Sequence, residues 1–331
     1  MQPLIAVDRV TKTYGARTAL AGATFTVPAG TITGLLGPNG AGKSTTLGII
    51  ATLLVADAGA VTVAGHRLPA EAAAVRRVLG FVPQRLALYP TLTARENLDF
   101  FARMQGLAGR AVRPAVDAAL ALVALDGRAD EPVTQFSGGM RRRLNLAAGI
   151  LHRPRVVLLD EPTAGVDPQS RERIFEAVQS LARDGAAVLY STHYMEEAER
   201  LCARVVLLDD GCVVAEGSPG ELVARTGMRP SVRLRTARPL PRGWLDGAAG
   251  ARLLERDAAA ILGDEPDLGS GTEPGVVVVG IDDDGAVSRV LAAAMRAGAD
   301  VVALSVHHPN LADAFFVLTG RALRDDNGAA S

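Results

Sequence analysis

The sequence predicts an α/β fold built around a parallel β-sheet, followed by a smaller α+β domain. Residues 155–162 (RVVLLDEP) and 186–193 (AAVLYSTH) are continuous apolar strands separated by a helix, a pattern typical of a parallel sheet covered on both faces. A short apolar strand at residues 31–37 leads into a glycine-rich stretch and then a helix. The chain has 331 residues, enough for one large and one small domain.

The elements in chain order support this architecture. Residues 4–36 alternate strand-like runs with turns, and residues 59–68 (GAVTVAGHRL) indicate a further strand and turn. Apolar residues three and four apart predict mostly helix from about residue 71 to residue 124. Residues 204–217 predict a hairpin that turns at Asp210 and Gly211.

The domain boundary is predicted where the composition changes. We expect a large domain at residues 1–227, with a helical subdomain at about 85–150, and a small domain at residues 228–324. Residues 228–275 are weakly patterned and rich in Arg, Pro, Gly and Ala. A strand, helix, strand, helix order follows them. Residues 325–331 are predicted to be a disordered tail.

Charge and cysteine content exclude several classes of protein. The net charge of −1 gives no overall field to attract nucleic acid or an anionic membrane. Cys202 and Cys212 fit no metal or redox motif, which indicates a reduced cytoplasmic chain. The N-terminus lacks the pattern of a secretory signal, and no run of about 20 apolar residues occurs. We therefore expect a chain that does not span a membrane.

Residues 37–45 (GPNGAGKST) predict a phosphate-binding loop between a strand and a helix. The glycines allow a tight turn whose backbone N–H groups converge on an anion. Lys43 can reach the outer phosphates, and the Ser44 hydroxyl can bind Mg²⁺. Of the 35 basic residues, only Lys12 and Lys43 are lysine and the others are arginine. A lysine is more compact and flexible than an arginine, and one of the two lysines lies in this loop, which supports a phosphate-binding role. The predicted nucleotide contacts in the loop are Gly37, Pro38, Asn39, Gly40, Ala41, Gly42, Lys43, Ser44 and Thr45.

Two further motifs add chemistry. The apolar strand at residues 155–160 ends in Asp160 and Glu161, at the edge of an α/β sheet where ligands bind. We expect Asp160 to hold Mg²⁺, through water, and Glu161 to polarise the attacking water. Residues 137–139 (SGG) precede an amphipathic helix and form a second anion-binding geometry.

In this order the motifs resemble those of the ATP-binding subunits of ABC transporters, over about residues 4–225. The resemblance implies a P-loop NTPase nucleotide-binding domain of ABC type, with a core sheet, an antiparallel β subdomain and a helical subdomain. It implies that Tyr14 stacks on adenine, and that Gln84 is the Q-loop contact to Mg²⁺ and water. It assigns Asp167 to the D-loop and His193 to the switch at the γ-phosphate.

The resemblance divides the site residues by role. The resemblance implies that Glu161, His193 and Lys43 are catalytic. It implies that Ser44, Gln84 and Asp160 bind Mg²⁺. Nucleotide contacts outside the phosphate loop are Tyr14, Gln84, Ser137, Gly138, Gly139 and Asp167. The signature motif departs from the common pattern at Phe136 and Met140. Together with residues 89–107 and the C-terminal residues 307–323, this region is similar to the ATPases of daunorubicin-resistance-type drug and antibiotic exporters.

The resemblance also implies partners. Two copies of the chain are expected to form a head-to-tail homodimer in which Ser137–Gly139 of each reach the ATP held by the other. A separate membrane permease is expected to dock near Gln84 and residues 89–98, which places the chain at the cytoplasmic face of the membrane. No nucleic-acid partner is expected. A soluble ABC ATPase without transport and the ATPase of an importer remain alternatives. Cargo and the role of the small domain stay open.

Overall fold

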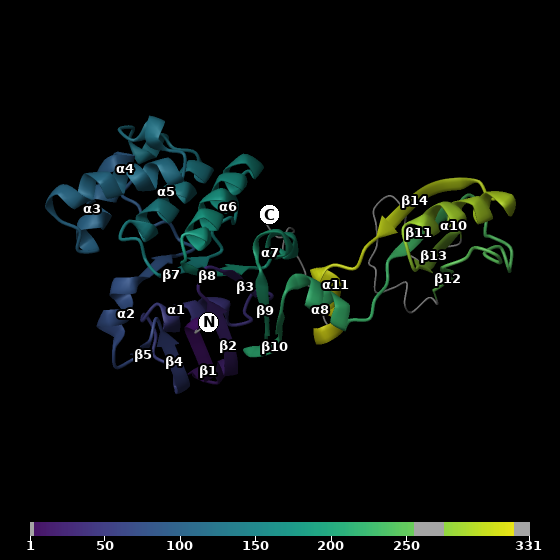
Figure 1. Ribbon diagram of the computed structural model, residues 1–331, viewed down its shortest axis with the longest axis horizontal. Helices are drawn as coiled ribbons and strands as arrows, with labels where there is room; N and C mark the ends of the chain where they lie inside the picture. Colours follow the sequence, from purple (N-terminus) through teal and green to yellow (C-terminus); the bar gives the residue numbers. More distant parts are fainter. Residues whose placement is uncertain (1–2, 255–274, 321–331) are drawn as a thin grey trace. The chain divides into compact units, whose positions relative to one another are not determined.

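The computed structural model describes residues 3–254 and 275–320, which form two compact units (Figure 1). The first unit ends at Pro219 and the second begins at Gly220. The division therefore falls at the start of helix α8 (Pro219–Arg225), whereas the boundary predicted from composition follows this helix. The predicted tail, residues 325–331, lies outside the described residues.

The core of the first unit is a six-stranded sheet in the order β10-β9-β3-β8-β7-β6. Neighbouring strands from β9 to β6 run parallel, and β10 pairs antiparallel with β9 as the predicted hairpin. Every residue of β3, β7 and β8 is buried, as their continuous apolar sequences predict. The strands are β3 (Ile32–Leu36), β6 (Leu79–Val82), β7 (Val156–Asp160), β8 (Ala187–Thr192), β9 (Arg204–Asp209) and β10 (Cys212–Gly217).

A second, antiparallel sheet in the order β2-β1-β4-β5 covers helix α1 (Lys43–Ile50). One apolar cluster joins this sheet, α1 and the core sheet, and includes Phe25, Leu47 and Leu158. Figure 1 shows α1 between the two sheets. This packing fixes the helix that follows the glycine-rich loop. The strands are β1 (Pro3–Tyr14), β2 (Arg17–Pro28), β4 (Ala58–Val63) and β5 (His66–Leu68).

Most helices of this unit occupy the opposite side of the core sheet, whereas α2 (Ala72–Val78) packs with the antiparallel sheet and α1 (Figure 1). Helix α3 begins at a capping box, in which Thr93 accepts from the Glu96 backbone N–H and Glu96 accepts from that of Thr93. The helices of this unit are α2 (Ala72–Val78), α3 (Ala94–Met104), α4 (Val112–Leu122), α5 (Gly138–Ile150), α6 (Pro168–Arg183) and α7 (Met195–Leu201). The predicted helical stretch, residues 71–124, also contains strand β6, whose four residues are too few to show a period of their own.

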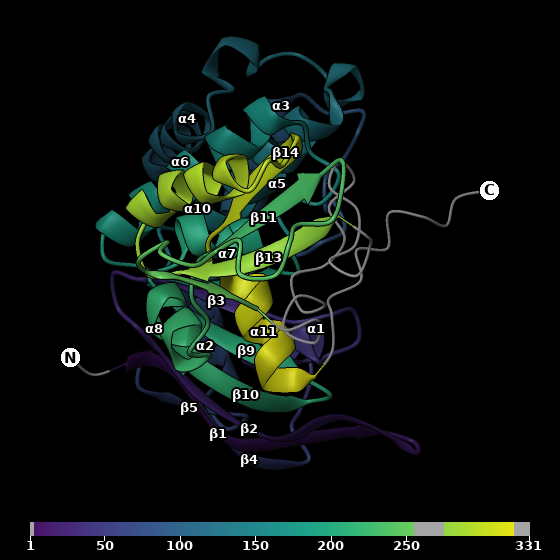
Figure 2. The same ribbon diagram turned by 90° about the vertical axis from the view of Figure 1, so that its right-hand side faces the viewer.

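The second unit is a four-stranded antiparallel sheet in the order β12-β13-β11-β14. Helix α10 (Gly285–Arg296) packs on one face over a small apolar core that includes Val232, Val279 and Val290. Figure 2 shows α10 across this sheet. The predicted strand, helix, strand, helix order appears as β13 (Val276–Ile281), α10, β14 (Val301–His307) and α11 (Leu311–Thr319). Strands β11 (Ser231–Thr236) and β12 (Ala251–Leu253) lie in the segment that is weakly patterned.

Candidate nucleotide-binding site

The glycine-rich loop lies between β3 and α1, as the sequence predicts. Gly40 and Gly42 have φ angles of 87° and 107°, in the left-handed region that residues with a side chain rarely adopt. A Cβ on Gly37 would lie 2.0 Å from the Leu208 carbonyl oxygen, so no larger residue fits there. These two requirements explain why this short loop carries its glycines.

Lys43 is the first residue of α1, and its side chain turns back over the loop. Its ammonium donates to the carbonyl oxygens of Gly37 at 2.6 Å and Pro38 at 3.0 Å. The side chain is only 6% exposed, and burial lowers the pKa of Lys43, an effect that the Glu161 and Asp160 carboxylates oppose. The Glu161 carboxylate lies 3.7 Å from the ammonium. The loop therefore holds a buried cation that an incoming anion can take over.

The two acids at the end of β7 point to different partners. The Asp160 carboxylate accepts from the hydroxyls of Ser191 at 2.8 Å and Ser44 at 3.4 Å. Glu161 has a φ of 45°, and its carboxylate faces Gln84 and His193 instead. Glu161 lies one residue beyond the end of β7, and its left-handed backbone conformation turns its carboxylate away from that of Asp160.

Glu161 is the centre of the predicted catalytic group. The Gln84 amide donates to one carboxylate oxygen at 3.0 Å, and His193 Nδ1 lies 3.1 Å from the other. The Glu161 backbone N–H donates to the Ser191 hydroxyl at 3.0 Å. With Lys43 included, residues from four separate chain segments thus meet at Glu161, whose side chain is 12% exposed.

A cavity of about 380 Å³ opens at the phosphate loop. Tyr14 lies on its wall and is 47% exposed, which leaves ring surface for stacking. The lining residues are Tyr14, Arg17, Ala19, Asn39, Gly40, Gly42, Lys43, Ser44, Thr45, Gln84 and Glu161. Among the described residues that line this cavity, none comes from the Ser137–Gly139 segment or the Asp167 turn.

Those two segments lie against each other elsewhere in the same unit. Ser137 caps α5 by accepting from the Met140 backbone N–H at 3.2 Å. Asp167 caps α6 by accepting from the Ser170 backbone N–H at 2.9 Å, a bond that lowers the pKa of Asp167. A Cβ on Gly139 would lie 2.2 Å from the Ser170 hydroxyl oxygen and 2.6 Å from the Asp167 carboxylate. The α5 and α6 N-termini therefore pack closely through Gly139.

The oxygen ligands near the phosphate loop fit a hard divalent cation. The Ser44 hydroxyl and the Asp160 carboxylate lie within hydrogen-bond distance of each other, and oxygen atoms of this kind are the ligands that Mg²⁺ prefers. Across residues 3–254 and 275–320, no cluster of three His, Cys, Asp or Glu side chains offers a separate metal site. The donor set thus suits a cation that takes its remaining ligands from a substrate and water.

Sequence reasoning missed three polar residues of the site. Ser191 bridges the Asp160 carboxylate and the Glu161 backbone. Arg142 of α5 donates to the backbone oxygens of Gln84 and of Ala164, the latter at 3.2 Å. Arg17 donates to the Gly40 carbonyl oxygen at 3.3 Å. Only Ser191 carried a signal, its place two residues before His193 on a buried strand.

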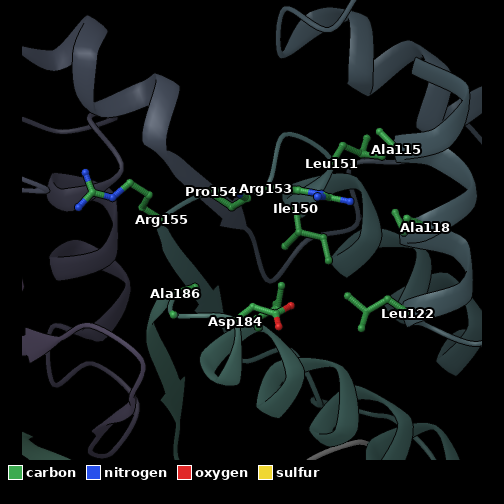
Figure 3. Close-up of a pocket in the computed structure, with 13 residues that line it drawn as sticks. Ala115, Ala118, Leu122, Ile150, Leu151, Arg153, Pro154, Arg155, Asp184 and Ala186 are labelled. Atoms are coloured by element: carbon green, nitrogen blue, oxygen red, sulfur yellow. The ribbon is translucent and has the colours of Figure 1, made fainter. Parts of the chain in front are cut away.

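A second cavity, of about 720 Å³, lies away from the predicted site residues. Figure 3 shows it among α4, the end of α5 and the end of α6, with Leu122, Ile150 and Asp184 on its walls. None of the residues predicted to bind nucleotide lines it. Volume alone therefore does not identify the site in this chain.

Comparison with known proteins identifies the family. The family described as ABC transporter matches residues 20–164. The linearmycin resistance ATP-binding protein of Bacillus subtilis (strain 168) is 38% identical over 97% of this chain and 100% of its own length. The chain belongs to the ABC transporter family. A daunorubicin resistance ATP-binding protein of Streptomyces coeruleorubidus is 40% identical, over 96% of each chain.

Solved structures agree with this ABC assignment. An ATP-binding subunit of an ABC transporter is 32% identical with a TM-score of 0.62, over 68% of this chain and 93% of its own. A dimeric ATP-binding cassette in a post-hydrolysis state with ADP and Pi is 29% identical with a TM-score of 0.59, over 65% of this chain and 98% of its own. The predicted P-loop fold of ABC type is confirmed, and the chain is a nucleotide-binding ABC ATPase.

Proposed function

We propose that this ABC ATPase drives export of a drug, an antibiotic or another amphipathic compound through a separate permease. The supporting observation is that the linearmycin resistance protein matches both units of the chain, over 97% of its length. The Nod factor export ATP-binding protein I of Ralstonia nicotianae is 42% identical over 67% of this chain and 69% of its own length. Relatives named for resistance and for export favour outward transport.

ATP is the proposed substrate, with its base on Tyr14 and its phosphates in the loop of residues 37–45. Lys43 would exchange the carbonyl oxygens of Gly37 and Pro38 for the outer phosphates, a stronger, charge-assisted contact. Ser44, Asp160 and Gln84 would hold Mg²⁺, which neutralises phosphate charge.

Hydrolysis is assigned to the residues around Glu161. Its carboxylate would accept a proton from the attacking water, as its hydrogen-bonded position beside Gln84 and His193 permits. His193 would donate to the γ-phosphate while its Nδ1 remains against Glu161. Burial of the group excludes bulk water and strengthens these contacts.

A second copy of the chain would complete each site. The cavity at the phosphate loop has no wall from Ser137–Gly139 or Asp167 of the same chain. Gly138 has nothing within 4 Å of where a Cβ would stand, so this stretch of backbone is open to a partner. A head-to-tail homodimer would close each nucleotide between the loop of one copy and the signature segment of the other.

Permease docking is proposed at the exposed apolar residues Leu86, Tyr89, Phe100 and Met104, which we call the docking surface. These side chains are 38–70% exposed, and the Tyr89 and Phe100 rings meet edge to face at 5.0 Å. The buried Asn97 amide holds the loop below them, accepting from the Tyr89 N–H at 2.8 Å and donating to the Tyr89 carbonyl at 3.0 Å.

The partner suited to this surface is an apolar segment of the permease at the cytoplasmic face of the membrane. None of the helices in the described ranges is long and apolar enough to cross a membrane. Membrane attachment is therefore proposed to come from the permease.

Co-expression with the permease of the neighbouring reading frame tests this function. Phe100→Asp should abolish co-purification and compound efflux while ATP binding by the isolated chain persists, because the change lies outside the nucleotide cavity. Met295→Asp is the matched control, since Met295 is also exposed, at 66%, but belongs to the second unit. Efflux that survives Phe100→Asp would reject the docking surface. A neighbouring frame without membrane spans would argue against export.

A further inference from the structure

Glu197 of α7 is a buried carboxylate that the mechanism above does not use. It is 3% exposed. One of its oxygens accepts from the hydroxyls of Thr163 at 2.9 Å, Tyr190 at 2.9 Å and Thr192 at 3.1 Å. The Thr163 and Tyr190 hydroxyls also lie 3.1 Å apart. Three hydroxyls from separate positions in the chain therefore converge on a single oxygen atom.

The positions of these hydroxyls connect Glu197 to the catalytic group. Thr163 lies two residues after Glu161, and Thr192 immediately precedes His193. The Thr192 hydroxyl also accepts from the Tyr194 backbone N–H at 3.0 Å. Glu197 thus holds both chain segments that carry the residues assigned to hydrolysis.

The other oxygen of Glu197 connects to α6. Arg171 Nε lies 3.5 Å from it. The Arg171 guanidinium also lies 5.9 Å from the centre of the Tyr194 ring, which packs against the His193 ring at 4.1 Å. Arg171 is one helical turn after Asp167, the N-cap of α6. The contacts therefore continue from the α6 N-terminus, through Arg171, to both loops.

The physical chemistry of this cluster argues for a role beyond packing. A buried carboxylate beside a cation is often no more stabilising than an apolar residue of equal volume, because the carboxylate loses its hydration. Burial and the Glu197 carboxylate raise the pKa of Tyr190, which keeps its hydroxyl protonated as a donor. A carboxylate that accepts several hydrogen bonds fixes the donor groups, and the chain segments that carry them, in a single relative geometry.

We propose that Glu197 is a positioning residue for ATP hydrolysis. It holds the Glu161 and His193 segments in register with each other and, through Arg171, with the N-terminal end of α6. Asp167 at that end packs against Gly139, which belongs to the segment proposed to meet the second copy. Displacement of α6 by that copy would therefore reach both catalytic segments through this carboxylate. The proposal rests on the roles proposed above for Glu161 and His193.

The test compares Glu197→Gln with Glu196→Gln, an exposed neighbour on the same helix. Glutamine keeps the size and can accept from the hydroxyls, but it loses the charge that faces Arg171. We expect the kcat of the purified full chain to fall about tenfold, while the ATP dissociation constant stays within about twofold, because the nucleotide cavity is unaltered. Glu196→Gln should match the wild type in both.

Two measurements separate positioning from simple stabilisation. Turnover is expressed per bound nucleotide at a temperature well below the melting point of each variant, so that loss of folded protein does not count. Arg171→Gln, on a half-buried side chain, should reproduce the kcat loss, and the double variant should be no worse than either single change. If Glu197→Gln fails to fold, Arg171→Gln alone carries the test.

Normal turnover per bound nucleotide in both single variants would overturn the proposal, as would fully additive losses in the double variant. A wild-type chain that binds ATP without hydrolysing it would instead contradict the proposed function. These two failures are distinguishable, because the second appears before any substitution is made.

Discussion

The Gln84 side-chain amide donates to the Glu161 carboxylate at 3.0 Å, only two residues before the docking surface begins at Leu86. The Gln84 backbone oxygen accepts a hydrogen bond from Arg142 of α5. A partner that moves residues 86–104 therefore pulls on a residue in direct contact with the proposed general base. The short segment from the docking surface to Gln84 is therefore a sufficient route for coupling between the permease and hydrolysis.

Gln84→Glu tests that contact. Two carboxylates at hydrogen-bond distance repel each other, so Glu161 must move or one of the pair must bind a proton. We expect kcat to fall by about tenfold or more, as measured by steady-state turnover at saturating ATP and Mg²⁺. Gln105→Glu, at the exposed end of α3, is the matched control. Equal turnover in the two variants would show that the Gln84–Glu161 contact is dispensable.

Lys43→Ala removes the buried cation of the phosphate loop. We expect ATP affinity to fall by at least about tenfold, because a charge-assisted phosphate contact is lost. Lys43→Arg should restore little, since the guanidinium is larger and the site is almost closed to solvent. Fluorescent-nucleotide binding measures both, with Arg77→Ala on exposed α2 surface as the control. Wild-type affinity in Lys43→Ala would refute the loop assignment.

Gly138 and Gly139 are adjacent, but we expect their substitution by alanine to have different effects, one on dimerisation and the other on stability. Gly139→Ala brings a Cβ against Ser170 and Asp167, so we expect it to destabilise the fold by about 1–3 kcal/mol in a denaturant titration. Gly138→Ala meets nothing within 4 Å in the same chain and should unfold like the wild type. Its methyl group should instead impair ATP-dependent dimerisation. Normal dimerisation of Gly138→Ala would exclude this backbone from the proposed interface.

Glu161→Gln should bind ATP but fail to hydrolyse it, because the amide cannot accept a proton from water. ATP then remains between the two copies, and the variant should elute as a dimer with ATP and Mg²⁺ but as a monomer with ADP. Size-exclusion chromatography at micromolar protein measures this. Elution as a monomer under both conditions, even with the permease present, would contradict the head-to-tail arrangement.

The two cysteines should react at different rates with a maleimide. Burial, and secondarily the Glu197 carboxylate, raise the pKa of Cys202 to about 12, so almost no reactive thiolate exists at pH 8. Cys212 is exposed. We expect one thiol per chain to react quickly and the second only after unfolding, as counted by mass spectrometry. Rapid labelling of Cys202 in the Cys212→Ser variant would show that this part of α7 opens readily.

The sequence was sufficient for the motifs that depend on a short stretch of chain. The phosphate loop, the buried strands and the acids at the end of β7 follow from glycine geometry and apolar runs, which are local properties. Strand β6 was missed because its pairing with β7 joins residues far apart in sequence. Four residues cannot reveal such a partner.

The contacts within the site were less predictable for the same reason. Ser191, Arg142 and Arg17 contact residues that lie 22 to 58 positions away in the sequence. Apart from the position of Ser191 two residues before His193, nothing in their own neighbourhoods marks them as unusual. Glu197 is a further case, because Glu196 and Glu199 beside it have the same chemistry and lie exposed. Burial, a tertiary property, is what distinguishes one glutamate from the others.

The positive φ of Glu161 lowers the stability of the fold at a residue whose carboxylate is proposed to be needed for ATP turnover. A residue with a side chain pays about 1–3 kcal/mol to occupy that conformation, whereas glycine adopts it freely. A protein descended from this one that no longer needs to hydrolyse ATP would become more stable if glycine replaced Glu161. Glycine at position 161 in a descendant sequence would thus be evidence of abandoned catalysis, even where every other motif had been inherited intact.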